Sequence, residues 1–166
     1  MTRIAIVTGA GQGIGEGIAR QLVQDGLSVA VADMNEKNAR NVADEIGNNS
    51  KGYYVDVSDK KSVFDLIDHV VADFGKLDVL VNNAGIAQIG TLLDTKEEDF
   101  DKIMNVNIKG VLFGIQLPQP NLRNKEPAEK LSVPHPLLAT RDSSYLGLIL
   151  QLNLPFEDSH KLLLKN

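Results

Sequence analysis

Short apolar runs alternate with amphipathic stretches along the first 116 residues of the chain. Runs rich in β-branched residues are typical of buried strands, whereas apolar residues at every third or fourth position are typical of helices. The pattern predicts strands over 3–7 (RIAIV), 28–33 (SVAVAD), 52–57 (GYYVDV) and 77–81 (LDVLV). It predicts helices over 13–26, 35–47, 58–75 and 95–116.

The predicted strands are continuous apolar runs, which is typical of a parallel sheet with helices on both faces. Right-handed crossovers then give the strand order 3-2-1-4, with a topological switch point beside the first strand. The predicted fold class is therefore α/β, a doubly wound parallel sheet of the Rossmann type. It is truncated to its first half and followed by an irregular C-terminal tail.

Small residues mark the expected ends of the helices. Gly26, Gly47 and Gly75 follow the last apolar positions of the first three helices, where glycine commonly ends a helix. Ser58 precedes the third helix and is expected to cap its N-terminus.

The pattern breaks after Gln116. All six prolines follow this residue, and thirteen of the fourteen glycines precede it. Prolines at this density stop helix propagation and do not fit a central strand. We therefore expect one folded domain over 1–116 and a tail without an evolved fold over 117–166.

Composition and charge narrow the possible functions. The net charge of −5 offers no basic surface, so neither nucleic acid nor an anionic membrane is an expected partner. The chain has no cysteine, and its three histidines lack ligand spacing, so no metal site is expected. No apolar run has the length of a signal peptide or a membrane span, which favours a soluble cytoplasmic protein.

A glycine-rich turn, TGAGQGIG over 8–15, joins the first predicted strand to the first helix. Gly9 suits a tight turn, Gly13 lets the backbone approach a pyrophosphate, and Gly15 allows close packing of helix and strand. Asp33 ends the second strand, where a carboxylate accepts ribose hydroxyls and repels a 2′-phosphate. No Arg or Lys follows within three residues, so NAD is favoured over NADP. The alternative is a turn with a purely structural role.

Four motifs together resemble the short-chain dehydrogenase/reductase family. They are TGAGQGIG over 8–15, VDVSD over 55–59, NNAG over 82–85 and NVNIKG over 105–110. The resemblance implies roles in binding NAD and in catalysis for eleven residues. Gly9, Gly13, Ile14 and Gly15 would bind the pyrophosphate, Asp33 the ribose, Asp56 and Val57 the adenine, Asn83, Ala84 and Gly85 would line the cofactor, and Asn107 would hold the catalytic water of a proton relay.

Simpler roles remain open for three of these residues. Asp56 could cap the helix region that follows it. Asn83 could be only a hydrogen-bonding bracket between strand and loop, and Asn107 could be a solvated or locally bonded helix side chain.

Within the family, TGAGQGIG, VNNAGIAQ and VLFGIQ are most similar to the acetoin (diacetyl) reductases, also called butanediol dehydrogenases. This resemblance implies an oxidoreductase that interconverts small vicinal carbonyls and alcohols with NAD, and a homo-oligomeric parent protein. The family's catalytic serine, tyrosine and lysine are absent. Tyr145 is the only tyrosine after Gln116, and Ile149 stands where the lysine would follow it.

A shifted reading frame accounts for the missing catalytic residues. The peptide over 147–153 (GLILQLN) can be encoded by bases that, read out of step, give Pro-Tyr-Ser-Ala-Thr-Lys. This is the family's Tyr-x-x-x-Lys, and the rest of the tail shifts in the same way. We therefore expect 117–166 to be an out-of-frame tail and the chain to be inactive. Two alternatives are a non-catalytic NAD-binding module and a fragment that folds poorly.

Overall fold

A computed structural model of the chain describes residues 2–88 and 90–116. The tail over 117–166 lies outside the described residues. The predictions that concern it, namely its lack of a fold and the absence of a lysine after Tyr145 at Ile149, therefore fall outside the described residues as well. The described strands are β1 (Ile4–Thr8), β2 (Ser28–Asp33), β3 (Lys51–Tyr54) and β4 (Val79–Val81). The helices are α1 (Gly13–Gln24), α2 (Glu36–Ile46), α3 (Lys60–Phe74), a 3₁₀ turn (Leu92–Asp94), α4 (Glu97–Met104), a π segment (Asn105–Lys109) and α5 (Gly110–Ile115).

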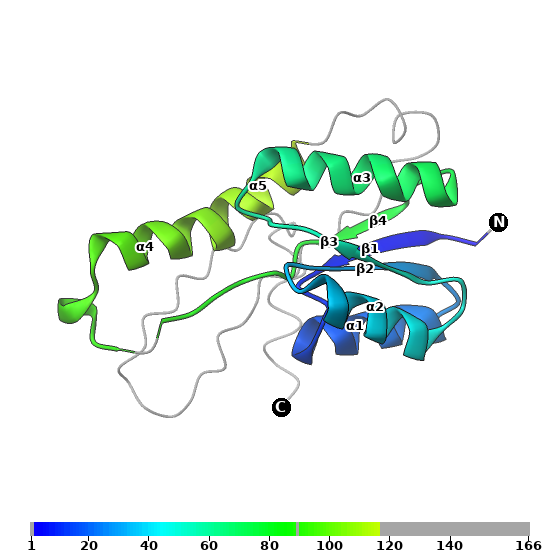
Figure 1. The fold of residues 1–166 in the computed structure, drawn as a ribbon, viewed down its shortest axis with the longest axis horizontal. Coiled ribbons are helices and arrows are strands. Elements are labelled where there is room, and N and C mark those ends of the chain that lie inside the picture. The colour runs from blue at the N-terminus through cyan, green and yellow to red at the C-terminus, as the bar shows by residue number, and fades with distance from the viewer. Residues whose placement is uncertain (1, 89, 117–166) are drawn as a thin grey trace, which may run out of the picture.

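The four described strands form one parallel sheet in the order β3-β2-β1-β4. Helices α1 and α2 cover one face, and α3 and α5 lie on the other (Figure 1). The predicted fold class, the strand order and the switch point beside β1 are therefore confirmed.

Alternate residues of β1 point to opposite faces of the sheet, and both faces are apolar. Ala5 and Val7 belong to the core beneath α1 and α2. Ile4 and Ile6 belong to a second core, beneath α3. Because a strand has a period of two, only a continuous apolar run can supply both cores.

Glycine ends two of the first three helices, and the predicted N-cap of α3 was wrong. Helix α1 ends at Gln24 with Asp25 as its C-cap, and Gly26 follows with a φ of +87°. Gly47 and Gly75 are the C-caps of α2 and α3, both with positive φ. The N-cap of α3 is Asp59, whose side chain accepts a hydrogen bond from the Lys61 amide at 3.0 Å. Ser58 instead donates its hydroxyl to Asp56 Oδ1 at 2.7 Å, so it lies in the preceding turn.

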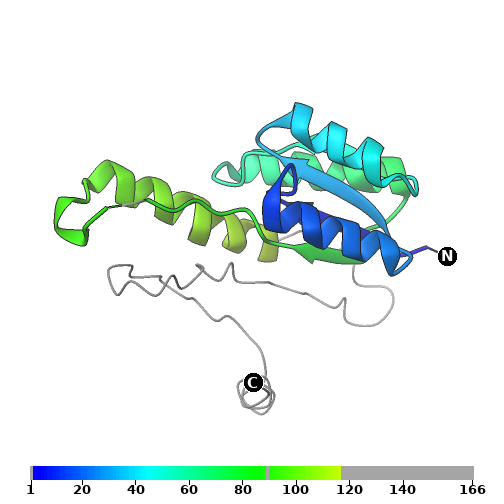
Figure 2. The ribbon, with the colours of Figure 1, turned by 90° about the horizontal axis from the view of Figure 1, so that it is seen from below.

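Two predicted elements differ in extent from the observed ones. The third strand ends at Tyr54, because Asp56 already turns the chain through its hydrogen bonds to Ser58. The helix expected over 95–116 is divided by the π segment into α4 and α5. Helix α4 reaches away from the sheet, whereas α5 lies close to it (Figures 1 and 2).

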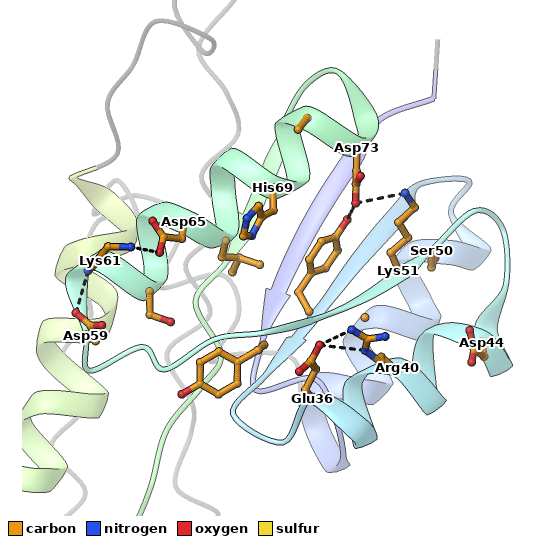
Figure 3. Close-up of a pocket in the computed structure, with 16 residues that line it drawn as sticks. Glu36, Arg40, Asp44, Ser50, Lys51, Asp59, Lys61, Asp65, His69 and Asp73 are labelled. Carbon is orange, nitrogen blue, oxygen red and sulfur yellow. Dashed lines mark hydrogen bonds and ion pairs between the residues drawn. The ribbon is translucent and has the colours of Figure 1, made fainter.

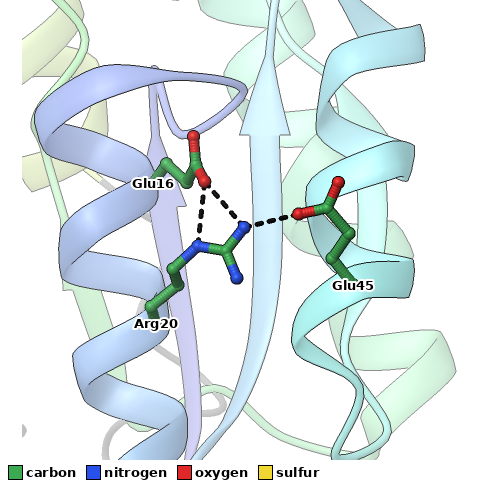
Figure 4. A network of polar contacts seen from close by, with 3 residues as sticks. All are labelled: Glu16, Arg20 and Glu45. Atoms are coloured by element: carbon green, nitrogen blue, oxygen red, sulfur yellow. Dashed lines mark hydrogen bonds and ion pairs between the residues drawn. The ribbon is translucent and has the colours of Figure 1, made fainter.

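An exposed ion-pair network ties α1 to α2 (Figure 4). Arg20 bridges Glu16 on its own helix and Glu45 on α2, with its Nη2 atom 2.6 Å from Glu45 Oε2. The hydrogen bonds to the two carboxylates raise the pKa of Arg20 above its ordinary value. Exposed pairs stabilise little, so the network makes only a small contribution to the stability of the fold.

Among the described residues, no helix combines the length and apolar character needed to cross a bilayer.

Candidate functional site

A cavity of about 390 Å³ opens at the carboxyl ends of the central strands. It lies at the switch point beside β1, where the chain turns from β1 toward β2 on one side, while β4, reached from β3 through α3, pairs with β1 on the other side. Its lining residues are Gly9, Gln12, Gly13, Ile14, Gly15, Asp33, Met34, Val55, Val57, Asn83, Ala84, Gly85, Ile86 and Val106. Nine of the ten residues expected to bind the cofactor are in this set, and Asp56 is the exception.

Glycines allow close backbone packing at the floor of the cavity. A Cβ atom on Gly9 would lie 2.8 Å from Ala84 Cα, and one on Gly15 would lie 2.2 Å from the carbonyl oxygen of Gly9. These contacts bring the turn after β1 against both the start of α1 and the loop after β4. Gly13 has a φ of +62°, which favours glycine, and a Cβ there would point into open space.

Helix α1 begins at the cavity without a side-chain cap. Its N-cap residue, Gln12, accepts no hydrogen bond through its side chain. The N–H groups of the first turn therefore have no side-chain acceptor from the N-cap residue and can donate to a ligand. The helix dipole adds partial positive charge at the same place. Such a helix start binds phosphate groups well, and the glycines beside it leave room for one.

The Asp33 carboxylate is fixed at the cavity rim by main-chain donors. Its Oδ2 atom accepts a hydrogen bond from the Gly11 amide at 2.9 Å, and its Oδ1 atom accepts one from the Asn35 amide at 2.9 Å. Among residues 2–88 and 90–116, no lysine or arginine lines the cavity. No basic side chain of this part of the chain therefore stands beside the charge of Asp33 in the cavity.

A buried hydrogen-bond network joins β1 to the loop after β4. Thr8 Oγ1 accepts from the amides of Asn83 and Ala84, both at 3.1 Å, and donates to Val81 O at 3.3 Å. The Asn83 side-chain amide donates to Thr8 O at 2.9 Å and to Gly9 O at 3.3 Å. Asn83 is thus the bracket between strand and loop that the sequence left open, and it also lines the cavity.

Of the two residues expected at the adenine, the structure brings only Val57 to the cavity. Asp56 Oδ1 accepts from the Ser58 amide at 2.9 Å and from its hydroxyl. The Asp56 amide in turn donates to Ser62 Oγ at 3.0 Å. The contacts of Asp56 are thus local to the turn before α3, but the helix cap that the sequence left open for it is Asp59.

Asn107 lies behind the cavity wall. Its Oδ1 atom accepts from the Ile86 amide and its Nδ2 atom donates to the Ile86 carbonyl, both at 2.9 Å. Ile86 and Val106 line the cavity, whereas Asn107 does not. Its amide oxygen and nitrogen each keep one further hydrogen-bonding position, which a water could use.

Several residues of the site were missed in the sequence. Thr8 is the first residue of the glycine motif itself, and Met34, which lines the cavity, directly follows Asp33. Val106 belongs to the π segment, which no sequence pattern indicated, and Ile86 is bonded to Asn107 of the same segment.

A second, larger cleft of about 830 Å³ lies along β3, between α2 and α3 (Figure 3). Six of its charged side chains form ion pairs with one another: Glu36 with Arg40, Lys61 with Asp65, and Lys51 with Asp73. Burial and a 2.6 Å hydrogen bond to Asp73 raise the pKa of Tyr53, and the same bond lowers the pKa of Asp73. None of the predicted site residues lines this cleft, so the smaller cavity is the candidate site.

Curated relatives match most of the chain. A diacetyl reductase ((S)-acetoin forming) of Staphylococcus epidermidis is 41% identical over 119 residues, covering 70% of this chain and 46% of the relative. An L-2,3-butanediol dehydrogenase of Corynebacterium glutamicum is 45% identical over 121 residues, covering 70% and 47%. A 3-oxoacyl-(acyl-carrier-protein) reductase of Staphylococcus aureus is 44% identical over 127 residues, covering 74% and 51%. The chain thus spans about half the length of these relatives.

Solved structures similar to this chain include reductases of the same kind. A short-chain dehydrogenase/reductase of Burkholderia phymatum, in complex with NAD, has a TM-score of 0.74 and 30% identity over 79% of this chain and 48% of that one. A 3-ketoacyl-(acyl-carrier-protein) reductase of Brucella melitensis, complexed with NADH, has a TM-score of 0.66 and 35% identity over 69% and 47%. The family model described as short chain dehydrogenase matches residues 3–129. The chain therefore belongs to the short-chain dehydrogenase/reductase family of oxidoreductases.

Proposed function

We propose that this chain is the cofactor-binding half of an NAD-dependent oxidoreductase of small vicinal carbonyls and alcohols. The observation that carries the proposal is the Asp33 carboxylate, fixed by two main-chain amides at the rim of a glycine-lined cavity. When bound, NAD supplies the acceptor or donor of a hydride. The cytoplasmic location and the homo-oligomeric parent protein stay proposals that rest on the family.

The donor set of the cavity fits such a cofactor. The uncapped amides at the start of α1, with Gly9, Gly13, Ile14 and Gly15, would hold the pyrophosphate. Asp33 would accept the adenosine ribose hydroxyls. Val57 would border the adenine, and 83–85 would line the rest of the cofactor. Asp56 is proposed beside the adenine on the family resemblance alone, because its contacts are local.

Asn107 is proposed, on the family resemblance, to hold the water of a proton relay. Its bonds to Ile86 give it a second role, in which it fixes the loop after β4 against the cavity. Both roles are compatible, since each side-chain atom retains one free hydrogen-bonding position.

Replacing Asp33 tests the cofactor proposal. In Asp33→Ala, NAD binding should weaken by about ten-fold or more, the loss expected for hydrogen bonds to a charged group. The affinity for NADP should rise relative to the affinity for NAD, because the carboxylate that repels the 2′-phosphate is gone. Calorimetric titration with both dinucleotides measures the two effects. Asp44→Ala, at an exposed position on α2, is the matched control and should bind as the parent chain does. Unchanged discrimination in Asp33→Ala would contradict the assignment.

Diacetyl, acetoin and butanediol are the proposed substrates, supported by the diacetyl reductase and butanediol dehydrogenase relatives. A 3-oxoacyl thioester is the second candidate, favoured by the equally similar carrier-protein reductase. NADH oxidation with diacetyl and with an acetoacetyl thioester, compared in a protein with the restored reading frame, separates the two.

We propose that the break after Gln116 reflects a shifted reading frame and that 117–166 is an out-of-frame tail. The composition change and the hidden Tyr-x-x-x-Lys support this reading. The family match reaches residue 129, so the DNA to re-sequence runs from codon 116 to codon 129. An unbroken frame there would favour a non-catalytic NAD-binding module, and a chain that aggregates without NAD would favour a poorly folding fragment.

A further inference from the structure

A side chain at Gly11 would crowd the Asp33 carboxylate. Gly11 is buried between the end of β2 and the start of α2. A Cβ atom at this position would lie 2.9 Å from Asp33 Cγ, 3.0 Å from Asp33 Oδ2 and 3.1 Å from Asn38 Cβ. Real Cβ atoms essentially never approach within 3.0 Å, so either the carboxylate or the turn would have to move.

The backbone of Gly11 does not itself require glycine. Gly9 and Gly13 have positive φ angles, whereas Gly11 does not. An alanine could therefore adopt the same backbone conformation without strain, and its cost would come from the crowded space alone.

The group that would be crowded cannot move freely. Gly11 donates its own amide to Asp33 Oδ2, and Asn35 donates to Oδ1, so both oxygens are held. Each carboxylate oxygen keeps one lone pair, enough for one ribose hydroxyl apiece. Displacing the Asp33 carboxylate would break its hydrogen bond to the Gly11 amide. It would also change the direction in which the two carboxylate oxygens can accept hydrogen bonds from a ligand.

We propose that Gly11 is a positioning residue for dinucleotide selectivity, acting through Asp33. Its missing side chain and its amide together hold the carboxylate where it accepts two ribose hydroxyls and repels a 2′-phosphate. The inference rests on the proposed NAD-binding function. It concerns a residue that has no pyrophosphate role in the motif and that does not line the cavity.

Gly11→Ala tests the inference by calorimetric titration with NAD and with NADP. NAD binding should weaken by about ten-fold, the loss expected for one hydrogen bond to a charged group, and the preference for NAD should narrow. Gly17→Ala is the matched control, because Gly17 is exposed on α1 and a Cβ there would meet nothing within 4 Å. It should bind both dinucleotides as the parent chain does.

A double-mutant cycle separates action through Asp33 from a general change of the turn. In an Asp33→Ala background there is no carboxylate to displace, so Gly11→Ala should cause no further loss. An equal loss in both backgrounds, or unchanged NAD preference in Gly11→Ala, overturns the inference. If Gly11→Ala does not fold, thermal melting decides: restored folding in the double variant supports the clash with Asp33, and continued failure refutes it. A parent chain that binds neither dinucleotide would instead refute the proposed function, and the inference with it.

Discussion

At the scale of single residues, Thr8 is the main polar junction of the described fold. Its hydroxyl accepts two amide hydrogens from the loop after β4 and donates to β4 itself. Both Thr8 and Asn83 are buried, so these groups have no access to bulk water. The geometry of the cavity floor therefore depends on one hydroxyl oxygen.

Thr8→Val removes this oxygen while keeping the shape of the side chain. The Ala84 amide then loses its acceptor, whereas the Asn83 amide keeps the carbonyl oxygen of Val81 at 3.1 Å. One unsatisfied buried donor costs about 1–3 kcal/mol, so we expect the free energy of unfolding to fall by about 1–3 kcal/mol in denaturant titrations. Thr2→Val, at an exposed position, is the control and should change little. A loss below about 0.5 kcal/mol in Thr8→Val would mean that water replaces the hydroxyl.

Sequence patterns located residues whose role follows from residue type and position. Asp33 and the glycines of 9–15 were found because a turn between strand and helix leaves few alternatives. Ser58 was mistaken for the cap of α3, and the contacts of Asp56 were left open, because Ser58, Asp59 and Asp56 can all cap or turn a chain. Their shared hydrogen bonds, which no single position encodes, decide among them.

At the scale of elements, the π segment joins α4, which reaches away from the sheet, to α5, which packs on it. Gly110 of α5 allows close contact with Val57, since a Cβ there would lie 3.1 Å from the Val57 side chain. Gly114 allows the same approach to Asn82. Between them and α4, Asn107 is bonded to Ile86 in the loop after β4. This segment therefore fixes a loop as well as joining two helices.

Asn107→Ala should release that loop. The Ile86 amide loses its acceptor, so we expect its hydrogen exchange to speed up by about ten-fold or more, as for one lost hydrogen bond of about 1.5 kcal/mol. Exchange in the β1–β2 ladder should stay unchanged. Asn105→Ala, in the same π segment, is the control, because the Asn105 side chain makes no hydrogen bond to any described residue. Equal protection of Ile86 in both variants would show that Asn107 is dispensable for the loop.

The existence and order of the elements could be predicted, but their ends could not be placed reliably. Apolar periodicity reports burial, which the sheet and its two helical layers impose along whole elements. The early end of β3 coincides with side-chain bonds between Asp56 and Ser58, and the π segment contains Asn107, which is bonded to Ile86 twenty-one positions away. Periodicity carries no information about these bonds.

At the scale of the whole molecule, the described residues form a sheet with β3 and β4 at its two edges. The cavity holds the donors for a cofactor, but the described residues offer no tyrosine or lysine within its lining. A carbonyl that accepts a hydride needs a proton as negative charge develops on its oxygen. The described residues therefore support cofactor binding, and none of the tyrosines or lysines among them lies in the cavity lining to supply that proton.

We therefore predict no measurable NADH oxidation with diacetyl by the 166-residue chain. Loss of a positioned general acid alone costs about a hundred- to ten-thousand-fold in rate, and its proposed partners are missing as well. Restoring the frame between codons 116 and 129 should recover activity in the same spectrophotometric assay. Turnover by the present chain would reveal an acid in 117–166, and an inert restored protein would refute the substrate assignment.

The π segment also sets the rotational phase of the long helix. Its wider hydrogen-bonded ring has the effect of one extra residue, and one residue turns an α-helix by about 100°. Deleting a single residue within 105–109 would make the helix regular and swing α4 about its own axis while α5 stayed seated on its glycines. The same five residues also reach the cavity, because Val106 lines it and Asn107 holds Ile86 in its wall. The outward face of α4, with the half-exposed Phe100, and the shape of the cavity wall are therefore set together, and a change of phase in α4 would alter both.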